Sequence, residues 1–235
     1  MNIGILTLSI HGNYGGVLQN FALNKVLEKL GHNSCTIDYK SLKHQQIKIK
    51  IFRLLRYLGG DYYIKHLSFL NPKFAFLYHI RTFADKHIAF TKVIKTKQEI
   101  GQVSSKFDAV IVGSDQVWRY LFIYDDVGAY FLDFVKDNVK RVAYAASVGV
   151  DYNEYPDAEL RKVCILYPKF DAVSVRESSA INLIQSLWAT KPMAEHVLDP
   201  TMLLEADYYR LIISQENVKR QNTNNLFYTS VPLKF

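Results

Sequence analysis

The sequence is poor in the residues that build disulfides, metal sites and membrane spans. Only two of its 235 residues are cysteines, Cys35 and Cys164. Two thiols so far apart in the chain form neither a metal-binding motif nor a disulfide framework, which favours a reducing compartment. No stretch approaches the roughly 18 consecutive apolar residues of a transmembrane helix, and the N-terminus does not resemble a secretory signal. We therefore expect a cytoplasmic protein with no bound metal.

Glycine is also scarce, with 11 in all, yet three glycines fall within residues 12–16. They belong to the stretch HGNYGGVLQNFAL, which follows an apolar run at residues 3–8. From Val17 onward, apolar residues recur at three- and four-residue steps, as on one face of a helix. Residues 34–39, SCTIDY, are typical of a strand. The order strand, glycine turn, helix, strand predicts the start of an α/β fold with a parallel sheet.

The glycine turn is a candidate anion site. In α/β folds ligands bind beyond the carboxyl ends of the strands, where helix N-termini present free N–H groups. Gly15 and Gly16 would let the backbone approach an anion, and Asn13 would hydrogen-bond to it or shape the turn. The alternative is that these residues only form a turn. Their spacing matches neither the dinucleotide-binding fingerprint nor the P-loop.

Polar residues follow further candidate strands along the chain. We expect strands at residues 107–113, 130–134, 141–149, 170–175 and 196–200. The polar residues near their ends are Ser114, Asp115, Gln116, Ser147, Arg176, Glu177 and Asp199. If the strands are parallel in one sheet, these residues share its carboxyl edge with Asn13, where a ligand cleft is expected. In another interpretation, Arg176 is only an ion-pair partner of Glu177.

The net charge of +7 is unevenly distributed. Residues 40–65 carry seven Lys or Arg against one acid, interleaved with apolar residues at helical steps. This pattern indicates contact with an anionic membrane or a lipid-linked acceptor at the inner face of the membrane, or else a solvated helix face. Nucleic acid is not expected, because no zinc-finger spacing or RRM motif accompanies the charge.

Seven motifs occur in order along the chain: NYGGVLQNFAL, TIDY, FDAVIVGSDQVW, YFLDF, KRVAYAASVG, FDAVSVRE and VLDPTMLL. Together they resemble the polysaccharide pyruvyl transferase family over residues 3–204. The resemblance implies a GT-B-like fold of two Rossmann-like lobes. It implies transfer of the pyruvyl group of phosphoenolpyruvate to a sugar hydroxyl of a bacterial surface polysaccharide, with no cofactor besides this donor substrate.

Roles for individual residues follow from this resemblance. Asp115 is the candidate base for the sugar hydroxyl, and Arg176 with Gly15 and Gly16 would bind phosphoenolpyruvate. The other expected substrate contacts are Asn13, Ser114, Gln116 and Ser147. Glu177 and Asp199 are expected at the edge of the site, where Asp199 would hold the turn at Pro200.

The chain also departs from the family pattern. Residues 178–180 are SSA, where family members commonly have a glycine. We expect a Rossmann-like N-terminal lobe at residues 1–213 with a helical, basic insert at 41–105, then a linker at 214–225. Residues 226–235 would begin a second lobe that the chain lacks, and this lobe would carry donor-site residues.

The expected activity is therefore that of a pyruvyl transferase, inactive if this chain is a truncated form. Two alternatives stay open: a GT-B glycosyltransferase that uses a nucleotide-sugar, and a non-catalytic lobe that binds glycan.

Overall fold

The computed structural model describes residues 1–9, 13–40, 72–124 and 126–215. The chain divides into two units, Met1–Leu204 and Glu205–Phe235. The sheet and the predicted site residues belong to the first unit. In the second unit, the described part includes helix α9 (Ala206–Gln215).

Two predicted segments lie largely outside the described residues. Of the basic segment at 40–65 only Lys40 is described, and its Nζ lies 3.3 Å from Oδ2 of Asp38. Membrane contact through this segment stays a prediction. The predicted linker and following strand, residues 214–235, lie outside as well, except for the last two residues of α9. Within the described residues, no helix is long and apolar enough to cross a bilayer.

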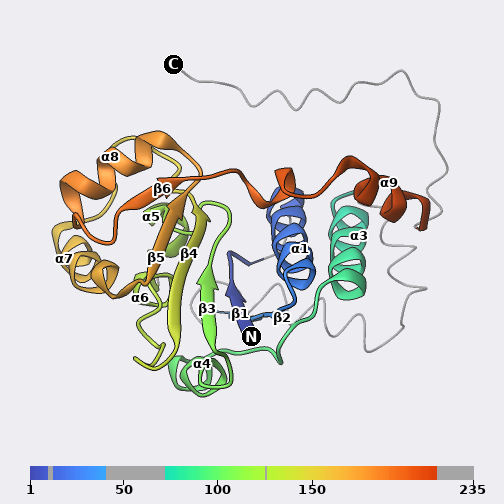
Figure 1. Cartoon of the computed structure of the whole chain (residues 1–235), viewed down its shortest axis with the longest axis horizontal. Coiled ribbons are helices and arrows are strands. Elements are labelled where there is room, and N and C mark those ends of the chain that lie inside the picture. The colour runs from blue at the N-terminus through green and yellow to red at the C-terminus, as the bar shows by residue number, and fades with distance from the viewer. Residues whose placement is uncertain (10–12, 41–71, 125, 216–235) are drawn as a thin grey trace. The chain divides into compact units, whose positions relative to one another are not determined.

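The first unit is built on a six-stranded parallel sheet in the order β2-β1-β3-β4-β5-β6 (Figure 1). Its strands are β1 (Asn2–Leu6), β2 (Asn33–Thr36), β3 (Ala109–Val112), β4 (Lys140–Ala146), β5 (Ala172–Val175) and β6 (Ala194–His196). The chain builds β2 on one side of β1 and then returns to build β3 on the other. Strand order therefore reverses between β1 and β3, which is the topological switch point of a doubly wound fold.

Helices flank this sheet, as expected for a Rossmann-like α/β fold. They are α1 (Tyr14–Lys29), α3 (Pro72–His87), α4 (Lys97–Ser104), α5 (Tyr120–Ile123), α6 (Val127–Tyr130), α7 (Asp157–Leu166) and α8 (Ser178–Leu187). Two short 3-10 helices, η1 (Tyr167–Lys169) and η2 (Pro200–Met202), also belong to the unit. Helices α1 and α3 contact each other and lie side by side in Figure 1. Parallel sheet and flanking helices confirm the predicted fold class.

Alternating residues of the central strands face two separate cores. The smaller core joins β1 and β3 to α1 through Ile3, Ile5, Ala109, Ile111, Leu23 and Leu27. The intervening residues of the same strands, Leu6, Val110 and Val112, belong to the larger core with α7 and α8. Because side chains alternate along a strand, this pattern buries both faces of the sheet.

Trp118 anchors the loop that follows β3. The ring is fully buried, and four other aromatic rings have centroids 5.3–6.1 Å away, those of Phe131, Tyr167, Phe170 and Trp188. The indole N–H donates to the carbonyl oxygen of Tyr130 at 3.0 Å. The hydroxyl of Tyr155 donates to the Trp118 carbonyl oxygen at 2.7 Å. The indole thus fixes the far end of a loop that begins with Ser114 and Asp115.

Several predicted elements have different bounds in the structure. Residues 130–134 were expected to be extended. Instead, Tyr130 is the last residue of α6 and residues 131–134 form a turn, in which Leu132 has φ +56°. This turn buries Phe131 and Leu132 in the larger core. The strand expected at 196–200 is wrong beyond its first residue, because β6 ends at His196.

Candidate functional site

The glycine pair lies inside a helix. Helix α1 begins at Tyr14, so Gly15 and Gly16 form its first turn instead of the loop before Val17 that the sequence suggested. Asn13 is the N-cap residue, but its side chain makes no capping hydrogen bond. Instead, Nδ2 of Asn13 donates to Oδ2 of Asp115 at 3.1 Å. Asn13 follows β1 and Asp115 follows β3, so this bond spans the switch point.

The carboxylate of Asp115 lies against the first turn of α1. A Cβ placed on Gly16 would be 3.3 Å from Oδ2 of Asp115, so a larger residue there would crowd the carboxylate. The positive end of the helix dipole favours a negative charge at this position. The carboxylate of Asp115 thus occupies the position at which the sequence suggested a bound anion. Substrate contacts by Gly15 and Gly16 stay a prediction.

The loop after β3 holds Asp115 in a defined backbone conformation. Gly113 has φ +125°, and a Cβ there would lie 2.2 Å from the carbonyl oxygen of Tyr144, so only glycine fits. Asp115 has φ +80°, in a region that aspartate enters more readily than most residues. Its carbonyl oxygen accepts from the N–H groups of Val117 at 2.7 Å and Ser147 at 2.9 Å. These bonds tie the β3 loop to the end of β4.

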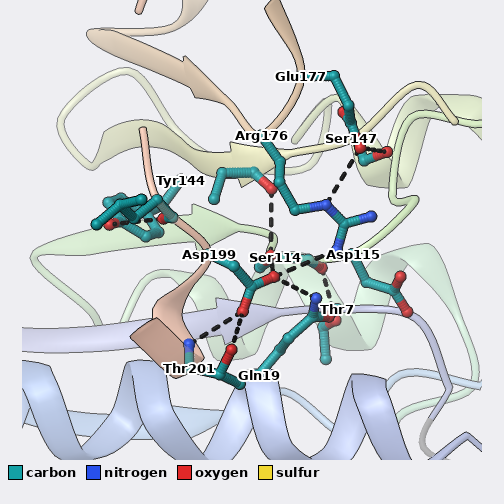
Figure 2. A network of polar contacts seen from close by, with 12 residues as sticks. Thr7, Gln19, Ser114, Asp115, Tyr144, Ser147, Arg176, Glu177, Asp199 and Thr201 are labelled. Atoms are coloured by element: carbon teal, nitrogen blue, oxygen red, sulfur yellow. Dashed lines mark hydrogen bonds and ion pairs between the residues drawn. The ribbon is translucent and has the colours of Figure 1, made fainter. Parts of the chain in front are cut away.

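Asp199 is the centre of a second group of contacts on the same edge (Figure 2). Its Oδ2 accepts from Nε2 of Gln19, from Nη1 of Arg176 at 3.2 Å and from Oγ of Ser114 at 3.4 Å. Its Oδ1 accepts from N and Oγ1 of Thr201 at 3.0 and 2.7 Å. Burial alone would raise the pKa of Asp199, but the hydrogen bonds from Thr201, Arg176 and Gln19 outweigh it and lower the pKa.

This group forms because the chain after β6 crosses back along the carboxyl edge. Helix η2 follows Asp199 directly and contacts α1, as Figure 1 shows. Asp199 thereby connects α1, the β3 loop and the end of β5 through Gln19, Ser114 and Arg176.

Arg176 lies between two carboxylates. Its Nε donates to Oε1 of Glu177 at 3.1 Å, while Nη1 contacts Asp199. Burial by itself would lower the pKa of Arg176, but the two carboxylates raise it instead. Oε1 of Glu177 also accepts from Oγ of Ser147 at 2.7 Å. Nη2 of Arg176 has no partner within the described part of the chain and is the nitrogen left for a ligand.

All ten predicted site residues lie at or beside this edge, but they form two groups. Asn13 pairs with Asp115, whereas Ser114, Ser147, Arg176, Glu177 and Asp199 form the connected group. Between described residues, no side-chain hydrogen bond joins Asp115 to Arg176. Gln116 belongs to neither, because its Oε1 accepts from Nη1 of Arg119 at 3.1 Å.

Sequence reasoning missed four residues of this edge. Gln19 is buried on α1, and a polar residue within the apolar stripe of a helix was the available signal. Thr7 donates from Oγ1 to the Ser114 carbonyl oxygen at 3.2 Å, and Thr201 supports Asp199. His196 places Nε2 2.9 Å from the carbonyl oxygen of Arg176. No sequence pattern pointed to Thr7 or His196, because each contacts a backbone carbonyl oxygen of a residue distant in the sequence. Thr201 is only two residues from Asp199, and the turn expected at Pro200 was the available signal. The described residues hold no group of three potential metal ligands.

The model of the polysaccharide pyruvyl transferase family matches residues 13–232 of the chain. The chain belongs to this family. The ordered motifs that suggested the polysaccharide pyruvyl transferases are therefore correctly interpreted. No curated protein matches the sequence.

Solved structures also resemble the chain, at low identity. One is a crystal structure of Alr3699/HepE from Anabaena in complex with UDP, with 10% identity and a TM-score of 0.49. It aligns with 85% of this chain and 44% of its own. Another is an alpha-glucosyltransferase with UDP and a 13-mer DNA containing an HMU base, with 12% identity and a TM-score of 0.41. It aligns with 85% of this chain and 42% of its own. The chain thus spans less than half the length of either structure.

Proposed function

We propose that this protein acts in the transfer of the pyruvyl group of phosphoenolpyruvate to a sugar hydroxyl of a bacterial surface polysaccharide. Family membership supports the reaction class. The assignment of Asp115 as the reactive group rests on the surroundings of its carboxylate. It stands at the switch point, accepts one side-chain hydrogen bond, from Asn13, and keeps Oδ1 without a partner among the described residues.

In the proposed reaction, Asp115 acts as the base for the attacking hydroxyl. As a sugar oxygen forms a bond to C2 of phosphoenolpyruvate, its proton passes to the carboxylate. C3 takes a proton from solvent, and phosphate leaves with the electron pair of the bond between C2 and the ester oxygen. A second hydroxyl of the sugar then bonds to C2 and loses its proton to solvent, so the product is a pyruvyl ketal and one phosphate is released.

The charge of the edge favours the sugar over the donor as the ligand held here. The side chains of the two groups include the carboxylates of Asp115, Glu177 and Asp199 and the single guanidinium of Arg176. Phosphoenolpyruvate carries a phosphate and a carboxylate, so this net negative edge repels it. A neutral sugar meets no such repulsion. Nη2 of Arg176 offers the donor one contact, and further cations must complete its binding.

The experiment is a measurement of phosphate release by the purified chain. The chain is incubated with phosphoenolpyruvate and a panel of sugars and oligosaccharides typical of surface polysaccharides. Release that depends on a sugar, and that Asp115→Asn abolishes, supports the proposal. Glu28→Gln is the matched control, because it removes a carboxylate from an exposed pair with Lys25 near the C-terminal end of α1, whose N-terminal end lies at this edge.

The alternatives are tested by adding a nucleotide-sugar as donor and by measuring sugar binding directly. Release of nucleotide from a nucleotide-sugar would identify a glycosyltransferase instead. Binding of a sugar without turnover of either donor would identify a glycan-binding lobe. Either result contradicts the proposal.

A further inference from the structure

Strand β4 contains a bulge just before its end. The register of β4 against β5 shifts between Ala143 and Ala146. In this interval two residues of β4, Tyr144 and Ala145, lie opposite a single residue of β5, Ser174. An extra residue of this kind makes a β-bulge and leaves backbone groups of the ladder unpaired. Ala145 also has φ +47°, which alanine adopts only at an energetic cost. The bulge therefore needs contacts from elsewhere in the fold to be stable.

The hydroxyl of Ser174 makes such contacts. Its Oγ accepts from the N–H of Ala145 at 3.1 Å and donates to the carbonyl oxygen of Ala143 at 3.1 Å. The hydroxyl thus replaces ladder bonds that the extra residue interrupts. Ser174 is buried, and it is the one polar residue in the β5 sequence AVSV. An alanine at this position would take this partner from two buried backbone groups, which is costly.

The loop after β3 packs directly on the bulge. Gly113 lies against the carbonyl oxygen of Tyr144, where a Cβ would come within 2.2 Å. The next residue, Ser114, donates from Oγ to the carbonyl oxygen of Ala145 at 3.2 Å. These two carbonyl groups belong to the two residues of the bulge. The start of the loop therefore takes its position from the bulge.

The backbone of Asp115 contacts β4 immediately after the bulge. Asp115 and Ala146 form a parallel bridge, and the carbonyl oxygen of Asp115 accepts from the N–H of Ser147 at 2.9 Å. A change in the bulge that shifted Ala146 and Ser147 would also shift the backbone of Asp115, and its carboxylate would move with it. Displacement of a reacting group by about 1 Å can lower a rate about 10²-fold.

We propose that Ser174 is a positioning residue for Asp115 and acts through the backbone of β4. Its hydroxyl holds the bulge, and the bulge holds the loop that carries Asp115. That this placement serves turnover rests on the proposed function. The placement itself does not, because it follows from the backbone contacts of β4.

The first test needs no activity and measures hydrogen exchange of backbone amides. In Ser174→Ala, we expect the amides of Ala145 and Ser147 to exchange about tenfold faster or more, and the amide signal of Asp115 to shift. Ser104→Ala is the matched control, because Ser104 is also buried and donates from Oγ to a carbonyl oxygen of its own helix, α4, at 2.9 Å. There the same amides should change less than about twofold. Urea denaturation of each variant separates local opening from a fall in global stability.

The second test measures turnover by phosphate release. Ser174→Ala should lower kcat about tenfold and change KM less than about twofold, because Asp115 acts in the chemical step. Ser174→Thr keeps the hydroxyl and should restore both kcat and the slow exchange of Ser147. If Ser174→Ala does not fold, Ser174→Cys replaces it. The thiol is only a weak donor and acceptor, so the same changes should appear to a smaller degree.

The outcomes separate this proposal from the proposed function. The positioning role is overturned if the amides of Ala145 and Ser147 exchange in Ser174→Ala as they do in Ser104→Ala. It is also overturned if Ser174→Ala raises KM alone or leaves kcat unchanged. If the unchanged chain releases no phosphate with any sugar, the proposed function fails, and the exchange of Ala145 and Ser147 then decides the positioning role by itself.

Discussion

Asp115 and Asp199 are two carboxylates on one sheet edge with opposite surroundings. Asp199 accepts from four residues of the first unit, and both of its oxygens are occupied. Asp115 accepts one side-chain hydrogen bond, on one oxygen. A carboxylate whose oxygens are all taken has little capacity left to receive a proton from a substrate. A carboxylate with a free oxygen on a fixed loop has that capacity.

The comparison indicates a division of roles along the edge: Asp199 stabilises the fold, and Asp115 takes part in the reaction. Asp199 connects α1, the β3 loop and β5, so its loss should appear mainly as lost stability. The side chain of Asp115 hydrogen-bonds only to Asn13 among the described residues, so its loss should appear mainly as lost activity. Four predictions test this division.

The largest effect is expected for Asp115→Asn. Loss of the base should lower turnover about 10²–10⁴-fold, the usual contribution of general acid–base catalysis. The melting temperature should stay close to that of the unchanged chain, because only one hydrogen bond is altered. Phosphate release and thermal unfolding, measured on the same preparation, check both parts. A large fall in melting temperature would show that Asp115 also supports the fold and would break the division.

A smaller effect, on stability, is expected for Asp199→Ala. This change leaves Arg176, Gln19 and Ser114 without their common acceptor, and the free energy of unfolding should fall by about 2–4 kcal/mol. Urea denaturation measures this fall. Asp207→Ala, at a highly exposed residue of α9, is the control and should change it by less than about 0.5 kcal/mol. If Asp199→Ala and Asp207→Ala have the same free energy of unfolding, the contacts of Asp199 do not stabilise the fold.

The stability of the fold should also depend on Asp199 through pH. The pKa of Asp199 is lowered in the folded chain, so its contribution is fully present above the unfolded value of about 3.9. The contribution is lost as the pH falls through the folded pKa. Urea denaturation from neutral pH downward should therefore show a smaller loss below about pH 4 for Asp199→Asn than for the unchanged chain. Parallel curves for the two proteins would exclude this role of the Asp199 carboxylate.

The smallest effect is expected for Asn13→Ala, which removes the one side-chain partner of Asp115. Without the hydrogen bond, the carboxylate is less well oriented, and turnover should fall about three- to tenfold. Asn13→Asp provides a contrast, since it places a second negative charge beside the first and should lower turnover further. Both are measured by phosphate release. Activity unchanged in Asn13→Ala would mean that the β3 loop alone orients Asp115.

The sequence predicted the strands and the shared edge because both depend on local patterns. The apolar runs at 107–113 and 170–175 contain β3 and β5, and a polar residue follows each run. The contacts within the edge could not be predicted in the same way. Gln19 and Asp199 meet only because η2 returns to α1, a tertiary path that no periodicity encodes.

The errors of prediction have a common cause. The glycine pair at 15–16 predicts a turn because glycine favours turns. These residues instead form the first turn of α1, where Asn13 bonds to Asp115 and the Asp115 carboxylate lies against Gly16. Residues 130–134 have strand-like side chains, but packing around Trp118 takes Phe131 into the core through a turn. In both places, tertiary contacts outweighed local propensity.

The contact between Gln19 and Asp199 also bears on the order in which the molecule forms. The two residues are 180 positions apart in sequence. Contacts of such separation close late in folding, because the intervening chain must be ordered first. During synthesis, β1 and α1 leave the ribosome long before Asp199 does. The edge therefore reaches its final geometry only when nearly the whole Met1–Leu204 unit has been made. A nascent chain that ends before Asp199 contains the switch point but lacks the hydrogen bonds by which Asp199 connects α1, the β3 loop and β5.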